Sequence, residues 1–494
     1  MQRYSLHQFL LLFTLAATFL TFQQCATNPV TGKKQFSLIS EQKEIQMGQS
    51  YDPQVVAEMG IYEDADLQNF LTSEGNKMAA QSERPNLPWT FRLVDNPVVN
   101  AFAVPGGFVY FTRGIMAHFN NEAQFAGVLG HEIGHVTARH TVQQQSKQTL
   151  AQIGLIGGMV LSPEIAAQGQ SLMQGMQLLF LKFGRDAESQ SDRLGVKYST
   201  AIGYDAAEMA GFFSTLDRLS GGAENRAPTF TSTHPDPLDR EQTVRQLANE
   251  AQAAQPSRQF EVGRDSYLRR IDGLLYGEDP NAGYVEAGSF YHPQLRFQFK
   301  VPGQWQLLNA PTQVQIVAPD QKSVIRMTLG QGESAEAAAR EFVQGNNIQV
   351  AQQSGNSING LRAYTVIGVA QQQQQAGQQA TPAIALEASF IEYGGNIYMI
   401  VGMAAETDFR RYQRDIEYTI GSFAELTDPS KLNRSPERIR IVTNNRSQTL
   451  QQALLSQGIP QDRLNEFSIL NGMELNETLP TGMLYKAISG GTIK

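Results

Sequence analysis

Three residues of the stretch His131-Glu132-Ile133-Gly134-His135 have the types and spacing of a metal-dependent hydrolytic site. On a helix, residues four apart lie on one face, one turn from each other, so both imidazoles can offer a ring nitrogen to one Zn²⁺ at about 2.0–2.1 Å. Glu132 is rotated away from that pair and can reach a water molecule as a general base. The spacing therefore predicts two metal ligands and one proton acceptor on a single helix.

A third protein ligand is available further along the chain, in Glu188-Ser189-Gln190-Ser191-Asp192. Glu188, on a second helix, would complete a His₂Glu set and leave the fourth position open, which is typical of catalytic zinc. Asp192 lies one turn after Glu188 and is placed to accept the free N–H of a ligating histidine, fixing its tautomer. We expect one Zn²⁺ per chain.

The surrounding residues favour a helix for the first motif. Asn120 or Asn121 is a suitable N-cap. Apolar residues then recur at helical spacing, at Phe125, Leu129, Ile133 and Val136. Three glycines cost this helix up to about 1 kcal/mol each relative to alanine, namely Gly127, Gly130 and Gly134. These glycines indicate the close approach of another element or of a substrate.

Four segments, in this order, resemble the zinc metallopeptidases of peptidase family forty-eight, of the CAAX prenyl protease and HtpX type. They are residues 100–108, residues 122–140, the segment with Glu188 and Asp192, and residues 234–240. The resemblance covers residues 41–250. It implies peptidase activity on protein or peptide substrates, with His131, His135 and Glu188 as zinc ligands and Glu132 as the base.

His234 stands in a proline-containing loop that could bring its imidazole over the metal. Two roles remain open for it. His234 either donates a hydrogen bond to the oxyanion of the tetrahedral intermediate, or it occupies the open coordination position and holds the enzyme latent. We expect Arg240 to anchor this loop through a carboxylate. The other histidines, His7, His118, His140 and His292, need no metal, and His140 is expected either close to the ligands or at the surface.

The N-terminus is typical of an export signal over residues 1–25. Arg3 precedes an apolar run at residues 9–22 that is too short for a confident membrane span. Cys25 is the only cysteine, which excludes an internal disulfide and favours lipid attachment. Residues 26–32 also resemble the start of mature lipoproteins in the exported branch of the family. Ordinary signal cleavage or an uncleaved anchor is the alternative, because Phe22-Gln23-Gln24 lacks small residues before the cysteine.

Composition sets the expected architecture. With 41% hydrophobic and 17% charged residues, the mature chain should be globular and contain several domains. We expect an α+β multidomain fold: a tether at 26–40, a mainly helical gluzincin-like zincin domain with a small sheet at 41–255, an α+β domain at 284–427 and a small βααβ module at 436–489. The net charge of −8 disfavours DNA and RNA as partners.

Two regions of the peptidase segment leave their role open. The strand expected at residues 108–111 would hold an extended peptide if it were a free sheet edge, and would touch no substrate if it were internal. The apolar stretches 153–161 and 171–181 could form a lid over the cleft, a membrane-surface contact or a buried helical hairpin.

The second half of the chain predicts two further units. Residues 284–427 loosely resemble PsbP-like domains, with a helix at 335–342, a strand pair within 386–404 joined at Gly394-Gly395, a closing helix at 409–423 and a polar insertion at 371–379. Residues 436–489 resemble a LysM-type module in Thr449-Leu450, Asn471-Gly472 and Pro480-Thr481-Gly482, although Arg446-Ser447-Gln448 departs from the usual Gly-Asp. This resemblance implies binding to an N-acetylglucosamine-containing glycan such as peptidoglycan.

The sequence as a whole predicts an exported zinc endopeptidase for misfolded or envelope proteins, anchored by lipid on the periplasmic side of a bacterial membrane, most naturally the outer membrane. In the expected mechanism, Zn²⁺ polarises the scissile carbonyl and lowers the pKa of its bound water to about 7. Glu132 takes the proton from this water. The alternative is a latent peptidase that acts as a chaperone-like scaffold or as a peptidoglycan-binding lipoprotein.

Overall fold

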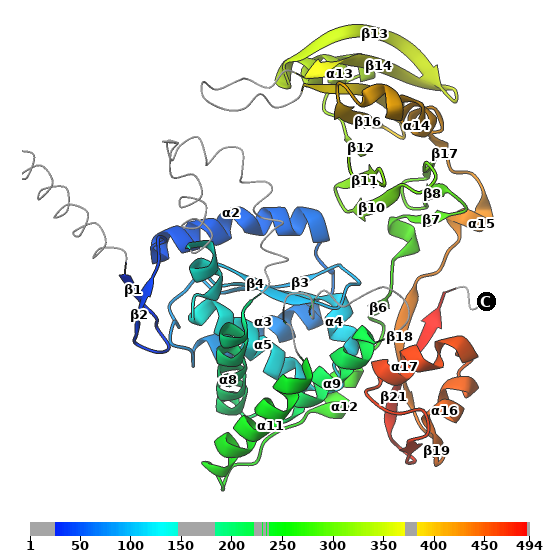
Figure 1. Cartoon of the computed structure of the whole chain (residues 1–494). Coiled ribbons are helices and arrows are strands. Elements are labelled where there is room, and N and C mark those ends of the chain that lie inside the picture. Colours follow the sequence, from blue (N-terminus) through cyan, green and yellow to red (C-terminus); the bar gives the residue numbers. More distant parts are fainter. Residues whose placement is uncertain are drawn as a thin grey trace, which may run out of the picture.

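The structure is a computed structural model that describes residues 25–146, 183–221, 230, 234, 237–370 and 383–491 (Figure 1). Three expectations lie outside these residues: the export signal before Cys25, the apolar stretches 153–161 and 171–181, and the insertion at 371–379. Within the described ranges, no helix is both long enough and apolar enough to cross a membrane. The described residues form helices and several sheets, as expected for a multidomain α+β chain.

The described part of the chain begins with a small hairpin, in the segment expected as a tether. Strands β1 (Cys25–Thr27) and β2 (Lys34–Phe36) pair antiparallel within the segment expected as the tether, residues 26–40. The Ser146 hydroxyl accepts a hydrogen bond from the backbone N–H of Leu38, and the Asn28 amide donates to the carbonyl of Ala138. The hairpin is therefore held against the residues that follow the motif helix.

Helices α2 (Glu41–Met59) and α3 (Ala65–Ala79) begin the segment that the sequence predicts as a mainly helical domain at 41–255, called the peptidase region below. Each has a side-chain N-cap, from Ser40 and Asp64 respectively, which satisfies a backbone N–H of the first turn. Both helices pack against the small sheet of the peptidase region (Figure 1).

The small sheet decides between the two roles left open for residues 108–111. Its strands β3 (Thr90–Val94), β4 (Ala101–Val104) and β5 (Phe108–Thr112) lie in the order β3-β5-β4. β5 runs parallel to β3 and antiparallel to β4, and all its residues are buried. The strand at 108–111 is thus internal and cannot be a free edge for a substrate peptide. Among the strands that the structure describes, β3 and β4 are the two edge strands of this sheet.

The motif helix α5 (Glu122–Thr137) is buried along its whole length. Asn121 is its N-cap and accepts from the backbone N–H of Gln124 at 2.7 Å. A Cβ atom at Gly130 would lie 3.0 Å from the Cα of Gly195 in helix α8 (Arg185–Ile202). The two helices therefore pack backbone against backbone at the motif, which explains why glycine is needed there.

Four further helices complete the peptidase region. They are α4 (Arg113–His118), α9 (Glu208–Ser220), α11 (Pro237–Ala253) and α12 (Arg264–Arg270). Helices α9 and α11 pack against each other, and α11 also contacts α8 (Figure 1). This arrangement places one face of α11 next to the motif helix pair.

Residues 284–425 build a second α+β region with two sheets. The larger sheet has the order β10-β11-β12-β16-β15-β14-β13, and the smaller has the order β17-β9-β8-β7. The strands are β7 (Tyr284–Glu286), β8 (Ser289–His292), β9 (Phe297–Lys300), β10 (Gln306–Ala310), β11 (Gln313–Val317), β12 (Ser323–Leu329), β13 (Ile348–Ile358), β14 (Leu361–Ala370), β15 (Ile384–Tyr393), β16 (Asn396–Ala405) and β17 (Ala424–Glu425).

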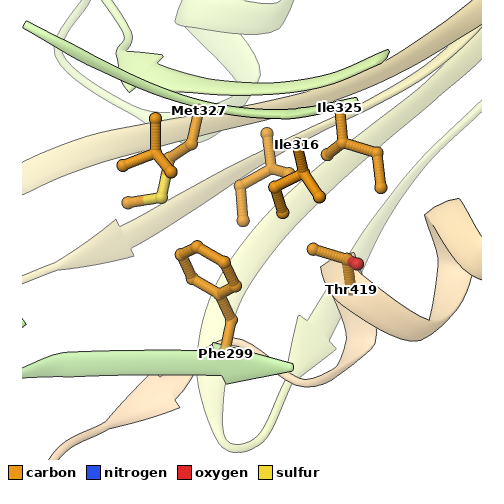
Figure 2. A pocket seen from close by; sticks show the side chains of 7 residues that line it. Phe299, Ile316, Ile325, Met327 and Thr419 are labelled. Carbon is orange, nitrogen blue, oxygen red and sulfur yellow. The ribbon is translucent and has the colours of Figure 1, made fainter. Parts of the chain in front are cut away.

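The helices of this region appear where the sequence predicts them. Helix α13 (Ala335–Gly345) and helix α14 (Phe409–Gly421) cover opposite faces of the larger sheet, because alternating residues of β15 belong to separate core clusters. β15 and β16 pair across Gly394-Gly395 as expected. A small apolar pocket lies between the sheet, β9 and α14, lined by Phe299, Val314, Ile316, Ile325, Met327, Ile400 and Thr419 (Figure 2).

The last segment has the strand, helix, helix, strand order. Its elements are β18 (Glu437–Thr443), β19 (Gln448–Thr449), α16 (Leu450–Ser456), α17 (Leu464–Leu470), β20 (Thr478–Leu479) and β21 (Leu484–Gly490). A reciprocal capping box between Thr449 and Gln452 starts α16. The main sheet of the module also includes β6 (Leu275–Tyr276), which precedes the second α+β region in the chain and pairs with β18.

The C-terminal module shares its hydrophobic core with the peptidase region. Figure 1 shows the module beside helices α9 and α12. Phe467 and Leu470 of the module belong to the same cluster of buried residues as Phe119 beside the motif helix. Lys486 is fully buried, and its ammonium group donates to three carbonyls, those of Ala117 at 2.8 Å, Phe119 at 2.7 Å and Leu470 at 2.9 Å. The module is therefore docked on the peptidase region rather than held at a distance by a linker.

We predict that Lys486→Met weakens this docking. The methionine keeps the apolar stem but leaves three buried carbonyls without their donor, so we expect a loss of about 2–4 kcal/mol of stability. The thermal unfolding midpoint and the rate of proteolytic removal of the C-terminal module measure the effect. Lys197→Met is the matched control, because Lys197 is half exposed and its surface ion pair with Glu83 contributes about 0–1 kcal/mol. Equal midpoints for both variants would show that the Lys486 contacts do not hold the module.

Candidate metal centre

Helices α5 and α8 bring the three expected ligands together. His131 Nε2 lies 3.0 Å from His135 Nε2, as the i,i+4 spacing requires. Glu188, in the first turn of α8, places its carboxylate oxygens 3.6 Å from His131 Nε2 and 3.5 Å from His135 Nε2. All three side chains are buried. The structure thus positions both imidazoles and the carboxylate around one common point.

His234 is the fourth member of this group. Its Nδ1 atom lies 3.0 Å from one Glu188 oxygen and 3.3 Å from His131 Nε2. One donor atom from each of His131, His135, Glu188 and His234 lies within 4.8 Å of all the others. The ring of Phe230 stacks on the His234 ring at 4.4 Å between centroids, which holds the imidazole in this orientation.

These residues fit a zinc ion. Ligand atoms at the corners of a tetrahedron with arms of about 2.0–2.1 Å are about 3.3 Å apart. Five of the six separations between the four donors are 3.0–3.6 Å, close to that value. Ring nitrogens that face one another at 3.0 Å in a buried site need either a shared proton or a shared cation between them. Three imidazoles and one carboxylate match the donor preference of Zn²⁺.

Glu132 lies beside the four donors without joining them. Its side chain is buried, and its Oε1 atom has no hydrogen-bond partner among the described residues. His234 Nε2 lies 3.6 Å from this Oε1 atom. A buried carboxylate oxygen without a partner is an unusual and costly feature, and it commonly marks a group with a chemical task.

Asp192 and Arg240 support the first ligand. Asp192 Oδ1 lies 2.9 Å from His131 Nδ1, the nitrogen that faces away from the donor cluster. Arg240, in α11, donates to both oxygens of Asp192, from Nη2 at 2.7 Å and from Nε at 2.9 Å. Arg240 Nη1 also lies 3.0 Å from a Glu188 oxygen. The sequence expectation that Arg240 meets a carboxylate thus finds two carboxylates in the structure.

Two aromatic contacts of the site were missing from the sequence expectations, and a third contact places His140. The rings of Phe183 and His135 lie 4.2 Å apart, and Phe230 covers His234. His140 is buried, and its Nδ1 lies 3.0 Å from His135 Nδ1. Phe183 is distant in sequence from His135, so no spacing rule predicts that contact. Phe230 lies four residues before His234, and the backbone N–H of His234 donates to its carbonyl, so this spacing was the one signal that could have indicated their contact. Of the two places expected for His140, the structure gives the one close to the ligands.

The electrostatics of the group are dominated by burial. Burial raises the pKa of the Glu132 carboxyl and lowers the pKa of His135 well below its usual value. Burial also opposes ionisation of Glu188, but His234, His135 and Arg240 outweigh it and lower its pKa well below the usual range. Burial lowers the pKa of His234, and the carboxylates of Glu188 and Glu132 more than reverse this effect. A bound divalent cation would instead favour neutral imidazoles.

The segment that contains these residues is similar to known peptidases. Residues 65–248 match Peptidase family M48. A beta-barrel assembly-enhancing protease of Yersinia pestis is 31% identical over 265 residues, which are 51% of this chain and 53% of the relative. Mitochondrial metalloendopeptidase OMA1 of Arabidopsis thaliana is 28% identical over 218 residues, which are 44% of this chain and 42% of the relative. The chain thus spans about half the length of these curated relatives.

A solved structure of cyanobacterial PsbP from Synechocystis covers 30% of this chain and 98% of its own, at 12% identity and a TM-score of 0.23. A score this low supports no argument, so the PsbP-like interpretation of residues 284–427 stays a prediction. The LysM-like interpretation of residues 436–489 and the lipoprotein branch of the family also stay predictions. The resemblance to family-forty-eight peptidases agrees with the match over residues 65–248, which are part of the chain. The matched residues include His131, His135, Glu188 and His234, so the candidate metal centre lies within the segment that is similar to Peptidase family M48.

Proposed function

We propose that this protein is an exported zinc metalloendopeptidase that hydrolyses peptide bonds of misfolded or unassembled envelope proteins. The observation that carries the proposal is the convergence of four buried donor atoms beside the unpartnered oxygen of Glu132. A structural zinc site has no use for such an oxygen, whereas a hydrolytic site needs a base next to the metal.

His131, His135 and Glu188 would hold the zinc ion, and the other residues would carry out the proton transfers and the positioning. A bound Zn²⁺ supplies the Lewis acidity that polarises a peptide carbonyl and makes water more acidic. Glu132 takes a proton from the attacking water and then delivers it to the leaving amine. Asp192 accepts from His131 Nδ1 and so fixes the tautomer in which Nε2 faces the donor cluster.

His234 is proposed to hold the fourth corner of the site, so that the described conformation is latent. Two features favour this role over oxyanion stabilisation. Its Nδ1, the atom that would bind the metal, lies among the other donors at 3.0–3.3 Å. The ring is also buried and stacked on Phe230, which holds Nδ1 among the donors. Catalysis then requires His234 to leave the donor cluster.

This latency supports a second candidate function. A chain whose fourth ligand is its own histidine can bind a partner without cutting it, which is the behaviour of a chaperone-like scaffold. The two candidates share the same site and differ in whether His234 ever leaves it.

The cellular setting is proposed from the sequence and from the names of the relatives. The export signal and Cys25 support a lipid anchor on the periplasmic side of a bacterial membrane, most naturally the outer membrane. The LysM-type pattern at 436–489 supports contact with peptidoglycan. The relatives named beta-barrel assembly-enhancing proteases support outer-membrane barrel proteins as the substrate class.

We predict that Glu132→Gln abolishes proteolysis without removing the metal. The amide cannot accept a proton, so casein cleavage should fall by about 10²–10⁴-fold, while zinc content and the melting temperature stay as in the wild type. EDTA should inhibit the wild type to a similar degree, with recovery on adding Zn²⁺. Glu63→Gln, in an exposed loop, is the control. Cleavage by purified Glu132→Gln at the wild-type rate would remove Glu132 from its role as base.

We predict that His234→Ala increases the basal rate of casein cleavage several-fold and weakens zinc binding, because it opens the fourth corner. The oxyanion role makes the opposite prediction, a fall of about 10²–10³-fold in kcat. Steady-state kinetics together with zinc titration distinguish these outcomes. His292→Ala is the matched control, since His292 lies in β8 of the second α+β region.

A further inference from the structure

We infer that His140 is a positioning residue for the metal ligand His135. In this arrangement a hydrogen bond between the two Nδ1 atoms fixes the tautomer of His135 and turns its Nε2 lone pair toward the other donors. The inference rests on the proposed zinc site, and it concerns a residue to which neither the HExxH spacing nor the mechanism above gives a task.

The partners of His140 determine where its proton lies. Its Nε2 lies 3.0 Å from Gln190 Oε1, and an amide oxygen can only accept a hydrogen bond. The His140 Nε2 atom must therefore carry the hydrogen. In the neutral ring this leaves Nδ1 as an acceptor, and Nδ1 lies 3.0 Å from His135 Nδ1. His135 Nδ1 then donates, and its Nε2 keeps the lone pair that a metal ligand needs.

A second contact agrees with this assignment. The hydroxyl of Ser191 lies 3.3 Å from the same Nδ1 of His140, where it can donate. Gln190 and Ser191 both belong to α8, the helix that also provides Glu188. One helix thus supplies a ligand and also orients the histidine that holds another ligand.

The two histidine ligands of α5 are consequently held in different ways. His131 Nδ1 meets the carboxylate of Asp192 at 2.9 Å, whereas His135 Nδ1 meets the neutral ring of His140 at 3.0 Å. A carboxylate partner raises the basicity of a ligand more than a neutral partner does. The site therefore gains orientation at His135 without adding another buried negative charge.

The backbone conformation at Arg139, between the two histidines, determines where His140 lies. Arg139 has a left-handed backbone, with φ of 62°, which a non-glycine residue adopts only when its surroundings hold it there. Its guanidinium donates to Glu44 Oε2 at 2.9 Å and to the Ile39 carbonyl at 2.7 Å. This turn lies between α5 and the helical residues that begin at His140, and it leaves His140 against His135.

A second arginine, Arg84, also forms hydrogen bonds with Glu44. Arg84 donates to both oxygens of Glu44, at 2.8 and 3.0 Å, and to the carbonyl of Val136 in the last turn of α5 at 3.0 Å. Glu44 is almost completely buried, so α2 holds the end of the motif helix and the Arg139 turn through one carboxylate. The position of His140 is thereby tied to the scaffold.

The test compares two substitutions of His140 in the full-length protein. His140→Phe keeps a ring of similar size but removes the acceptor, so we expect zinc affinity to fall by about 10–100-fold. His140→Asn places an amide oxygen near the position of Nδ1, so we expect it to stay closer to the wild type than to His140→Phe. Competition with a chromophoric chelator measures affinity, and the visible spectrum of the Co²⁺-substituted protein reports ligand geometry. Both readouts are independent of proteolysis.

His118→Phe is the matched control. His118 is also a buried histidine of the peptidase region, but its Nδ1 lies 2.7 Å from the carbonyl of Gly114 and it touches none of the four donors. This variant should lose stability and keep the zinc affinity and the Co²⁺ spectrum of the wild type.

Wild-type zinc affinity in His140→Phe would overturn the inference, and so would an affinity of His140→Asn closer to that of His140→Phe. Absence of zinc binding in the wild type is a separate result, because it overturns the proposed function and the inference with it.

Discussion

The constraint on which the site depends is the burial of four donor atoms that face one another within hydrogen-bonding distance. Lone pairs in such an arrangement repel unless a proton or a cation lies between them. The packing of two helices brings these donor atoms together. Gly130 and Gly195 allow α5 and α8 to approach until backbone meets backbone, and this approach brings Glu188 to the histidine pair. A larger residue at either glycine would move the third ligand away from the first two.

Much of the site could be predicted because its signals are local. The i,i+4 spacing of the histidines and the position of Asp192 one turn after Glu188 both follow from helical geometry. The place of Glu188 beside the histidines could be inferred only from ligand chemistry and family resemblance. The sequence left open whether His140 lies close to the ligands or at the surface, because its place depends on a left-handed residue, Arg139, whose side chain is held by Glu44 from another helix. It also left open whether residues 108–111 form a free or an internal strand, since the position of β5 between β3 and β4 is a matter of long-range pairing.

The helices at 335–342 and 409–423 and the strand pair within 386–404 could be predicted, since helical periodicity and alternation are strong there. What the sequence could not indicate is the packing of the C-terminal module on the peptidase region. Periodicity describes each module as a separate unit, while Lys486 connects the last strand to the carbonyls just before the motif helix. The loop before that helix is therefore held from two directions, by its own N-cap Asn121 and by the C-terminal module. A module so attached can transmit a change at its own surface to the start of α5.

Charge balance offers an independent reason for a divalent ion. The buried groups of the site include three carboxylates, Glu132, Glu188 and Asp192, and one guanidinium, Arg240. With neutral imidazoles, one positive and three negative charges leave a net charge of −2, and Zn²⁺ cancels it. Without a cation the protein must relieve the imbalance by protonation, which is the direction that the raised pKa values of Glu132 and His234 indicate. A bound Zn²⁺ would therefore favour release of these protons and the ionised form of Glu132, which the role of a base requires.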